Sequence, residues 1–309
     1  MTDITQIPFE LGLVEAALTH AEHLYVRTAD EVARVSSNGS VEILHTFGPQ
    51  SPLAFKGLVL IGHNLLTIDR PLGAAPILTS VSFEGDVRQY VAVPLHNPSG
   101  LTVLADRPMV LDQEVPMTRF LLGEQGECIA AEARNLTHWE VRGDELTYSD
   151  AAGLHQRQLT GSWSVVEQTG ILTFDLAGHC VIQTLEEGRA VFEVQSSGAS
   201  HTVTGVQRPV ALHQLSSGLF VRFRNQIAPV STPSALATLP NATDLGTVAE
   251  VSEGLSYLDD DRQLLWSADG VVWDQLKPDV RASDVVPASE TGLVLTGRRA
   301  CVWVKFAVI

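Results

Sequence analysis

The 309-residue sequence predicts an all-β fold in which eight similar four-stranded sheets form one closed ring. Two observations lead to this prediction. A short junction recurs eight times along the chain, and the runs around it are short, apolar and separated by turn residues. The composition agrees, because 45% of the residues are hydrophobic, 18% are charged and 24 are glycine, which suits many short strands joined by turns.

The recurring junction is a small or polar turn followed by a Leu or Ile that opens a new apolar run. The opening residues are Leu24, Leu58, Leu101, Leu136, Ile171, Leu219, Leu255 and Leu293. Their spacings are 34, 43, 35, 35, 48, 36 and 38 residues, and 40 residues lead from Leu293 through the C-terminus back to Leu24. Four antiparallel strands at a period of about 38 residues are typical of β-propeller blades.

The outer strand of the last blade is expected to come from the N-terminus. The seventh unit shows four runs, at 247–251, 255–258, 263–266 and 271–276, whereas the eighth supplies only three and ends at 301–306. Residues 4–9 precede the first unit and have no other assignment, so we expect them to complete the eighth blade. Residues 1–309 then form a single propeller domain. A seven-bladed ring is the alternative if the weak second or sixth unit is a false match.

One turn of the seventh unit carries a family resemblance. Residues 267–273 read Ser-Ala-Asp-Gly-Val-Val-Trp and resemble the Asp-box turn in the propellers of sialidases and sortilin-like receptors. The match is one residue short of the usual spacing, has Val272 where the family has Thr, and covers a single unit; 36–40 and 149–153 are fainter matches. The resemblance implies that the Asp and Ser side chains bond to backbone N–H groups and that Trp273 packs between blades. Sialidase chemistry does not carry over, because the Arg-Ile-Pro segment near the start is missing and the chain has only 4 Tyr.

Charge and termini restrict the partners. The formal net charge of −16 argues against nucleic acid and against an anionic membrane surface. The first residues resemble no secretory signal, and no apolar run approaches the roughly 18 residues of a membrane span. Cys128, Cys180 and Cys301 lie far apart in apolar segments, as reduced core thiols do. We therefore expect a cytoplasmic protein with no membrane partner.

A candidate ligand site is expected at the mouth of the central channel, which the first strand of each propeller blade lines. The aligned units place Glu132, Glu167, His213 and Glu250 there. They predict a polar pocket for a small ligand or ion, and a solvated channel without a ligand is the simpler alternative. The sequence has no metal-ligand spacing among its 10 His, no nucleophile elbow and no phosphate-binding glycine loop. It predicts no metal, cofactor or catalytic residue.

A candidate partner site follows from the longest spacing, the 48 residues between Ile171 and Leu219. The excess falls in 195–207, whose Ser, Gly and Thr content predicts a mobile loop with partner contacts at Ser197, Gly198, Ser200 and His201. A neutral extension is the alternative. The predicted function is a non-enzymatic protein-binding scaffold, a subunit or adaptor in a cytoplasmic assembly with an unidentified protein partner. The alternative is a carbohydrate or small-molecule binding protein, or a hydrolase, that uses the central channel.

Overall fold

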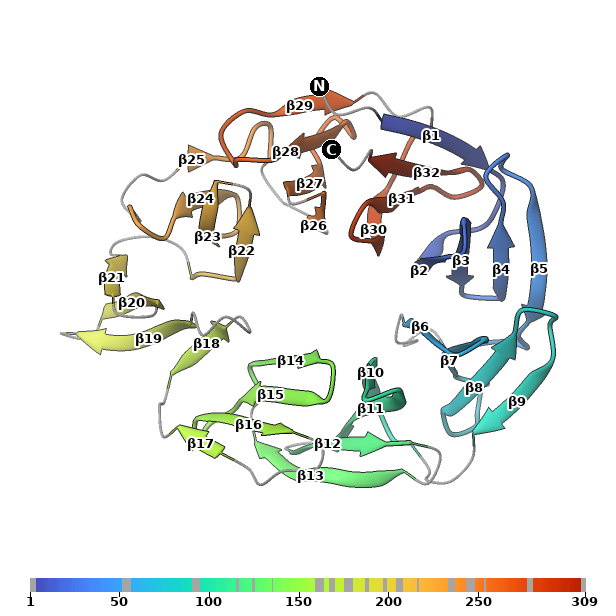
Figure 1. The fold of residues 1–309 in the computed structure, drawn as a ribbon, viewed down its shortest axis with the longest axis horizontal. Helices are drawn as coiled ribbons and strands as arrows, with labels where there is room; N and C mark the ends of the chain where they lie inside the picture. The colour runs from blue at the N-terminus through green and yellow to red at the C-terminus, as the bar shows by residue number, and fades with distance from the viewer. Residues whose placement is uncertain are drawn as a thin grey trace.

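The computed structural model contains eight four-stranded antiparallel sheets arranged as the blades of a ring, with no helix in the described part of the chain (Figure 1). The structure describes residues 4–51, 57–90, 95–114, 117–123, 126–134, 136–158, 164–166, 170–174, 180–186, 189–196, 199–203, 208–215, 217–232, 237–242, 248–252, 254–276 and 280–306. The eight-bladed prediction is confirmed and the seven-bladed alternative is wrong.

The first four blades, each given from the channel outward, follow one another along the chain. Blade 1 comprises β2 (Val14–His20), β3 (His23–Thr28), β4 (Glu31–Val35) and β5 (Val41–Thr46), and blade 2 comprises β6 (Leu58–Ile61), β7 (Asn64–Asp69), β8 (Ile77–Ser82) and β9 (Val87–Tyr90). Blade 3 comprises β10 (Pro98–Leu104), β11 (Arg107–Glu114), β12 (Met117–Leu122) and β13 (Glu127–Arg134), and blade 4 comprises β14 (His138–Arg142), β15 (Glu145–Ser149), β16 (Leu154–Gln158) and β17 (Ser164–Val166).

The last four blades complete the ring. Blade 5 comprises β18 (Ile171–Phe174), β19 (Cys180–Glu186), β20 (Arg189–Ser196) and β21 (Ala199–Val203), and blade 6 comprises β22 (Ala211–Leu215), β23 (Gly218–Arg222), β24 (Gln226–Pro229) and β25 (Ala237–Thr238). Blade 7 comprises β26 (Val248–Val251), β27 (Gly254–Leu258), β28 (Leu264–Ser267) and β29 (Asp274–Leu276), and blade 8 comprises β30 (Asp284–Ser289), β31 (Gly292–Thr296), β32 (Cys301–Phe306) and the N-terminal β1 (Ile4–Phe9).

The two ends of the chain close the ring as the sequence predicts. β1 pairs antiparallel with β32, from Ile4 opposite Phe306 to Phe9 opposite Cys301, and Figure 1 shows these two strands side by side. Ile7 and Phe9 are buried in a cluster that also contains side chains of blade 1. Blade 8 is therefore held both by backbone pairing and by packing between its neighbours.

The hydrophobic core is a circle of clusters between neighbouring blades. One cluster joins Tyr25 and Val32 of blade 1 to Leu65 and Val81 of blade 2, and similar clusters occupy the other seams. Successive side chains along a strand point to opposite faces of its blade, so each blade presents apolar residues to both neighbours. Each blade depends on both neighbours to bury its two faces.

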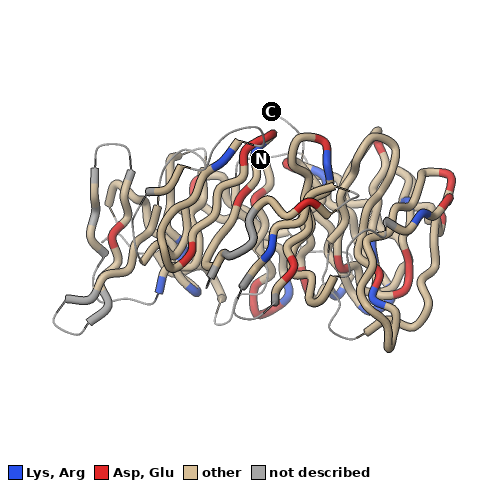
Figure 2. The backbone as a smooth tube through the Cα atoms, turned by 90° about the horizontal axis from the view of Figure 1, so that it is seen from below, with Lys and Arg blue, Asp and Glu red and all other residues tan. Residues whose placement is uncertain are grey.

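The antiparallel order defines two faces of the ring. Face A carries the turns between the first and second strands of each blade and between the third and fourth strands. Face B carries the remaining turns and the connections between blades. Seen from the side, Asp and Glu residues occur at many positions around the ring, with fewer Lys and Arg residues between them (Figure 2). Among the described residues, no helix is long and apolar enough to cross a membrane.

The sequence alignment of the blades is shifted by one strand over part of the ring. The landmarks Leu58, Leu101 and Ile171 lie in first strands, whereas Leu24 and Leu255 lie in second strands. An apolar run followed by a polar turn and another apolar run occurs at both of these turns, so the pattern alone does not separate them. The shift leaves the predicted number of blades correct, but it assigns the wrong residues to the channel in the shifted blades.

Two smaller expectations have mixed outcomes. Cys180 and Cys301 are buried thiols as predicted, whereas Cys128 is exposed on the outermost strand of blade 3, where one side of the strand faces away from the ring. The stretch 13–25, whose Ala, Leu and Glu content is also compatible with a helix, forms the β2–β3 hairpin.

Candidate functional site

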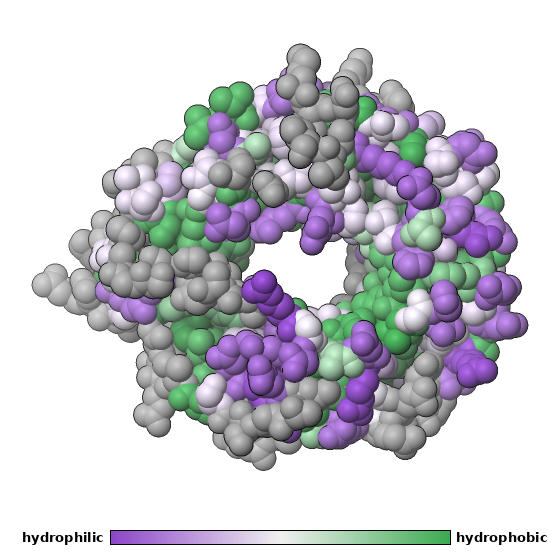
Figure 3. All heavy atoms as spheres, in the orientation of Figure 1, coloured by the Kyte–Doolittle hydropathy of each residue, from purple (hydrophilic) through white to green (hydrophobic). Residues whose placement is uncertain are grey.

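The central channel is open in the space-filling view, and hydrophilic residues form much of its rim (Figure 3). Two of the four predicted channel residues meet there. His213 lies on β22 and Glu250 on β26, the first strands of blades 6 and 7, and the His213 Nδ1 atom contacts the Glu250 Oε1 atom across the seam. The His213 side chain is 7% exposed and the Glu250 side chain is 53% exposed, so the pair places a carboxylate at the channel surface over a buried imidazole.

Arg222 completes this group, and it was not predicted from the sequence because it lies on a second strand, β23. Its Nε atom donates to His213 Nε2 over 3.1 Å. With Nε2 accepting, the network assigns the imidazole proton to Nδ1, facing Glu250. Burial lowers the pKa of Arg222 below its ordinary value, and the charge of Glu250 acts in the opposite direction. His213 thus bonds to both Arg222 and Glu250, and this polar network links blade 6 to blade 7.

The other two predicted channel residues do not join them. Glu132 lies on β13, the outermost strand of blade 3, so its placement at the channel mouth is wrong. The one-strand shift of the alignment is the reason. Glu167 lies outside the described residues. A pocket built from all four predicted side chains is therefore not formed by this part of the structure.

The described residues of the predicted partner loop belong to two paired strands of blade 5. Ser200 and His201 lie on β21, the fourth strand of blade 5, which pairs with β20 from Phe192–Val203 to Ser196–Ala199, and Ser200 is exposed. Ser197 and Gly198 lie outside the described residues. The prediction of an insertion is wrong. The 48-residue spacing is long because Ile171 lies on the first strand of blade 5 and Leu219 lies on the second strand of blade 6, so it covers one blade and one additional strand. A binding role of these residues stays a prediction.

Other buried charges also serve as ties at second strands. Arg27 of β3 is 0% exposed; its Nη1 atom donates to Glu15 Oε2 over 2.8 Å and its Nη2 atom to the Ile68 carbonyl of blade 2 over 3.0 Å. Asp112 of β11 is also fully buried and accepts from Arg119 Nη2 over 2.6 Å. Both Nη atoms of Arg27 and the Nη2 atom of Arg119 are paired within the protein, although the Arg27 and Arg119 Nε atoms are buried without an acceptor among the described residues. The bonds that these charges make explain their burial without a ligand.

The Asp-box-like turn of blade 7 has the hydrogen bonds that the resemblance implies. Asp269 Oδ1 accepts from the backbone N–H groups of Val271 and Val272, each over 2.8 Å, and Ser267 Oγ accepts from the N–H of Gly270 over 2.9 Å. The N–H of Val272, followed by that of Val271, lowers the pKa of Asp269 below its ordinary value. The carboxylate therefore fixes the backbone of this turn.

The turn is anchored on two blades and exposes an apolar pair. Trp273 is half-buried, not mostly buried as expected, and its ring stands edge-on to that of Tyr257 at 5.1 Å, in the cluster shared by blades 6 and 7. Ser217 of blade 6 donates its hydroxyl to the Asp269 carbonyl over 3.1 Å. Between these anchors, Val271 and Val272 are 71% and 68% exposed. Among the described large apolar side chains, no other adjacent pair is exposed in this way.

Acidic and imidazole side chains do not gather into a metal site in the described part of the chain. Within the described ranges, no group of three or more His, Cys, Asp or Glu side chains is arranged to hold a metal ion. The three Asp residues at 259–261 are engaged otherwise: Asp259 caps its own turn, and Asn241 Nδ2 donates to Asp259 Oδ2 over 3.1 Å and to Asp261 Oδ2 over 2.9 Å.

Comparison with known proteins identifies the fold and no family. No protein-family model and no curated protein sequence matches the chain. BamB from Moraxella catarrhalis superposes with a TM-score of 0.58 at 11% identity, over 97% of this chain and 99% of that chain. The AfRom2 CNH domain gives 0.56 at 7% identity, over 99% of both chains. The WD40 β-propeller domain of Doa1 gives 0.55 at 10% identity, over 99% of this chain and 97% of that chain. The chain thus has the β-propeller fold.

Proposed function

We propose that this propeller is a protein-binding scaffold of the cytoplasm, and that the Val271–Val272 turn on face A is part of its binding surface. The single observation that carries the proposal is an exposed apolar pair on a backbone that the protein holds rigid. The WD40 domain among the similar structures is compatible with this role, although the likeness itself extends to the fold alone.

The turn has the properties of an anchor. Exposed apolar side chains that stand together are costly in water and mark interaction surfaces. The Asp269 bonds and the Trp273 packing hold the two valines in place before any partner arrives. Preorganisation reduces the conformational entropy that binding costs. Burying two Val side chains is worth about 3 kcal/mol or more, which corresponds to roughly a hundredfold in affinity.

The charge of the chain indicates the kind of partner. With a net charge of −16, the molecule attracts basic protein surfaces over a long range and repels acidic ones. The proposed partner is therefore a protein that presents an apolar patch bordered by basic residues.

The test is affinity purification from the native cell with a Val271→Ser/Val272→Ser double variant. These substitutions remove the apolar surface but keep the two N–H groups that bond to Asp269, so the turn is retained. We expect at least one protein that co-purifies with the wild type to be lost with the variant, and the purified pair to bind about a hundredfold more weakly.

Leu72→Ser is the matched control. Leu72 is 68% exposed but lies between β7 and β8, on face B. It should retain the partner that the double variant loses. A partner set that is unchanged by the double variant, with melting temperatures alike, would remove the valine pair from the binding surface.

A further inference from the structure

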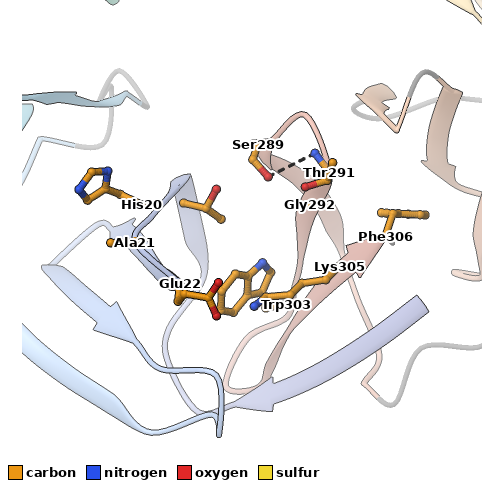
Figure 4. A pocket seen from close by; sticks show the side chains of 10 residues that line it. His20, Ala21, Glu22, Ser289, Thr291, Gly292, Trp303, Lys305 and Phe306 are labelled. Atoms are coloured by element: carbon orange, nitrogen blue, oxygen red, sulfur yellow. Dashed lines mark hydrogen bonds between the residues drawn. The ribbon is translucent and has the colours of Figure 1, made fainter. Parts of the chain in front are cut away.

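A cavity of about 260 Å³ opens on face A where the first and last blades meet. Its walls are the β2–β3 turn of blade 1, the β30–β31 turn of blade 8 and the end of β32. In Figure 4, Trp303 forms part of the pocket wall, with Glu22 of blade 1 and Lys305 of blade 8 beside it. A dry cavity of roughly 150 Å³ accommodates benzene, so this volume has room for a small organic molecule.

Two opposite charges line this cavity without pairing with each other. The Lys305 Nζ atom lies 3.8 Å from the centre of the Trp303 ring, and no described carboxylate lies within ion-pair distance of it. Glu22 is exposed in the β2–β3 turn and likewise has no described cation within that distance. The pocket therefore holds an ammonium group, seated over the Trp303 ring, and an exposed carboxylate, and neither forms an ion pair with a described residue.

The Trp303 indole adds an unused donor. Its side chain is 2% exposed, and its Nε1 atom is buried without a hydrogen-bond partner. Leaving such a donor unpaired costs about 1–3 kcal/mol. Blade 7 provides the internal comparison: Trp266 holds the equivalent place on the third strand, and its Nε1 donates to the Val251 carbonyl over 3.2 Å.

Gly292 lies beside the Trp303 indole N–H. A Cβ atom built on Gly292 would lie 3.1 Å from Ser289 Oγ and 3.3 Å from Trp303 Nε1, so the hydroxyl and the indole nitrogen flank the same position. The Ser289 hydroxyl accepts a single long bond, 3.3 Å from the N–H of Thr291. Rotation of the Ser289 side chain therefore breaks only one weak hydrogen bond, and it gives a ligand acceptor access to the Trp303 indole N–H.

We propose that this pocket binds a small zwitterion of the amino-acid class. The carboxylate of the ligand pairs with Lys305 and, after the Ser289 side chain turns aside, accepts from the Trp303 indole N–H. The ammonium group of the ligand pairs with Glu22. A simple carboxylate satisfies only the first two groups, and a simple amine satisfies only the third. The site lies away from the valine pair on the seam of blades 6 and 7, so it is independent of the proposed scaffold role.

Nuclear magnetic resonance of the indole N–H groups of the full chain tests the proposal. The 5 Trp residues give distinct signals, and Trp303→Phe and Trp266→Phe assign two of them. The probes are L-alanine, propionate and ethylammonium, which separate the two charges of the zwitterion. We expect L-alanine to shift the Trp303 signal with an affinity of about 1 mM, propionate to do so more weakly, and ethylammonium to leave it in place. The Trp266 signal, already bonded, should not move.

Two variants assign the contacts. Lys305→Met should weaken both carboxylate probes by about tenfold or more, as loss of a charge-assisted bond does. Glu22→Gln, at an exposed position, should remove the preference for L-alanine over propionate and leave propionate unchanged. If Lys305→Met fails to fold, Glu22→Gln still decides whether the ammonium group is recognised.

Three outcomes would overturn the proposal. A Trp303 signal that neither L-alanine nor propionate moves means that the pocket takes no carboxylate. Binding that survives Lys305→Met in a folded protein removes the cation from the site. Equal binding of propionate and L-alanine to the wild type shows that Glu22 does not recognise an ammonium group.

Discussion

Closure of the ring by β1 makes a quantitative prediction for the double variant Ile7→Ala/Phe9→Ala. Ile7 is 7% exposed and Phe9 is 4% exposed, and both pack in the cluster between blades 8 and 1. Truncating a buried Ile costs about 2–5 kcal/mol and truncating a buried Phe about 3–5 kcal/mol, because the surroundings collapse only in part. We expect the free energy of unfolding to fall by about 5–8 kcal/mol, most of what a typical domain has.

Equilibrium unfolding in urea, followed by Trp fluorescence, measures this loss. Thr5 is exposed on the same strand, so Thr5→Ala is the control and should change the free energy of unfolding by less than about 0.5 kcal/mol. Deletion of residues 1–9 should destabilise further and leave the outer edge of β32 unpaired, which favours concentration-dependent association. A double variant within about 1 kcal/mol of the wild type would refute the docking of β1 in the ring.

Two further predictions concern turns on face A. In chemical denaturation, Gly39→Ala should lower the free energy of unfolding by about 1–3 kcal/mol more than Gly62→Ala. Both glycines have a positive φ, +83° and +59°. A Cβ atom on Gly39 would lie 2.3 Å from the Pro8 carbonyl oxygen of β1, whereas one on Gly62 would have open space. Equal losses would show that β1 does not approach this turn. The stability advantage of the wild type over Asp269→Asn should be constant above about pH 5 and shrink as the pH falls through the lowered folded pKa of Asp269, because the turn stabilises the ionised form. A difference between urea unfolding curves that stays constant down to about pH 2 would contradict this.

The fold was predictable because its information is local and repeated. The first three strands of blade 7 were located to within one residue and the fourth to within three, since each is a short apolar run with a distinct turn beside it. Closure of the ring could be inferred as well. The last unit lacks one strand and the chain begins with one unassigned strand, so eight complete blades form only if the first strand joins the last blade. The pairing of residues 4–9 with residues 301–306 followed from the same count, whereas their register is known from the structure alone.

In blades 2 to 5, the sequence did not show which strand of each repeat is the innermost one. Two successive turns of a blade look alike in sequence, and only the packing of neighbouring blades distinguishes an inner strand from the second one. His213 and Glu250 were placed correctly because blades 6 and 7 were in phase, whereas Glu132 was moved from the outer edge of blade 3 to the channel. One slip of a strand thus changes the environment of every residue in the unit.

The closure pocket was out of reach for a different reason. Glu22 and Lys305 are almost a whole chain length apart, and they share a cavity only because β1 fastens the last blade beside the first. Neither residue belongs to a motif, and Trp303 differs from Trp266 only in what its indole N–H meets. In a closed repeat, the blades share the same strands and turns, and a site arises where one unit departs from its neighbours. The seam between the first and last blades is such a place, since one of its blades is assembled from both ends of the chain.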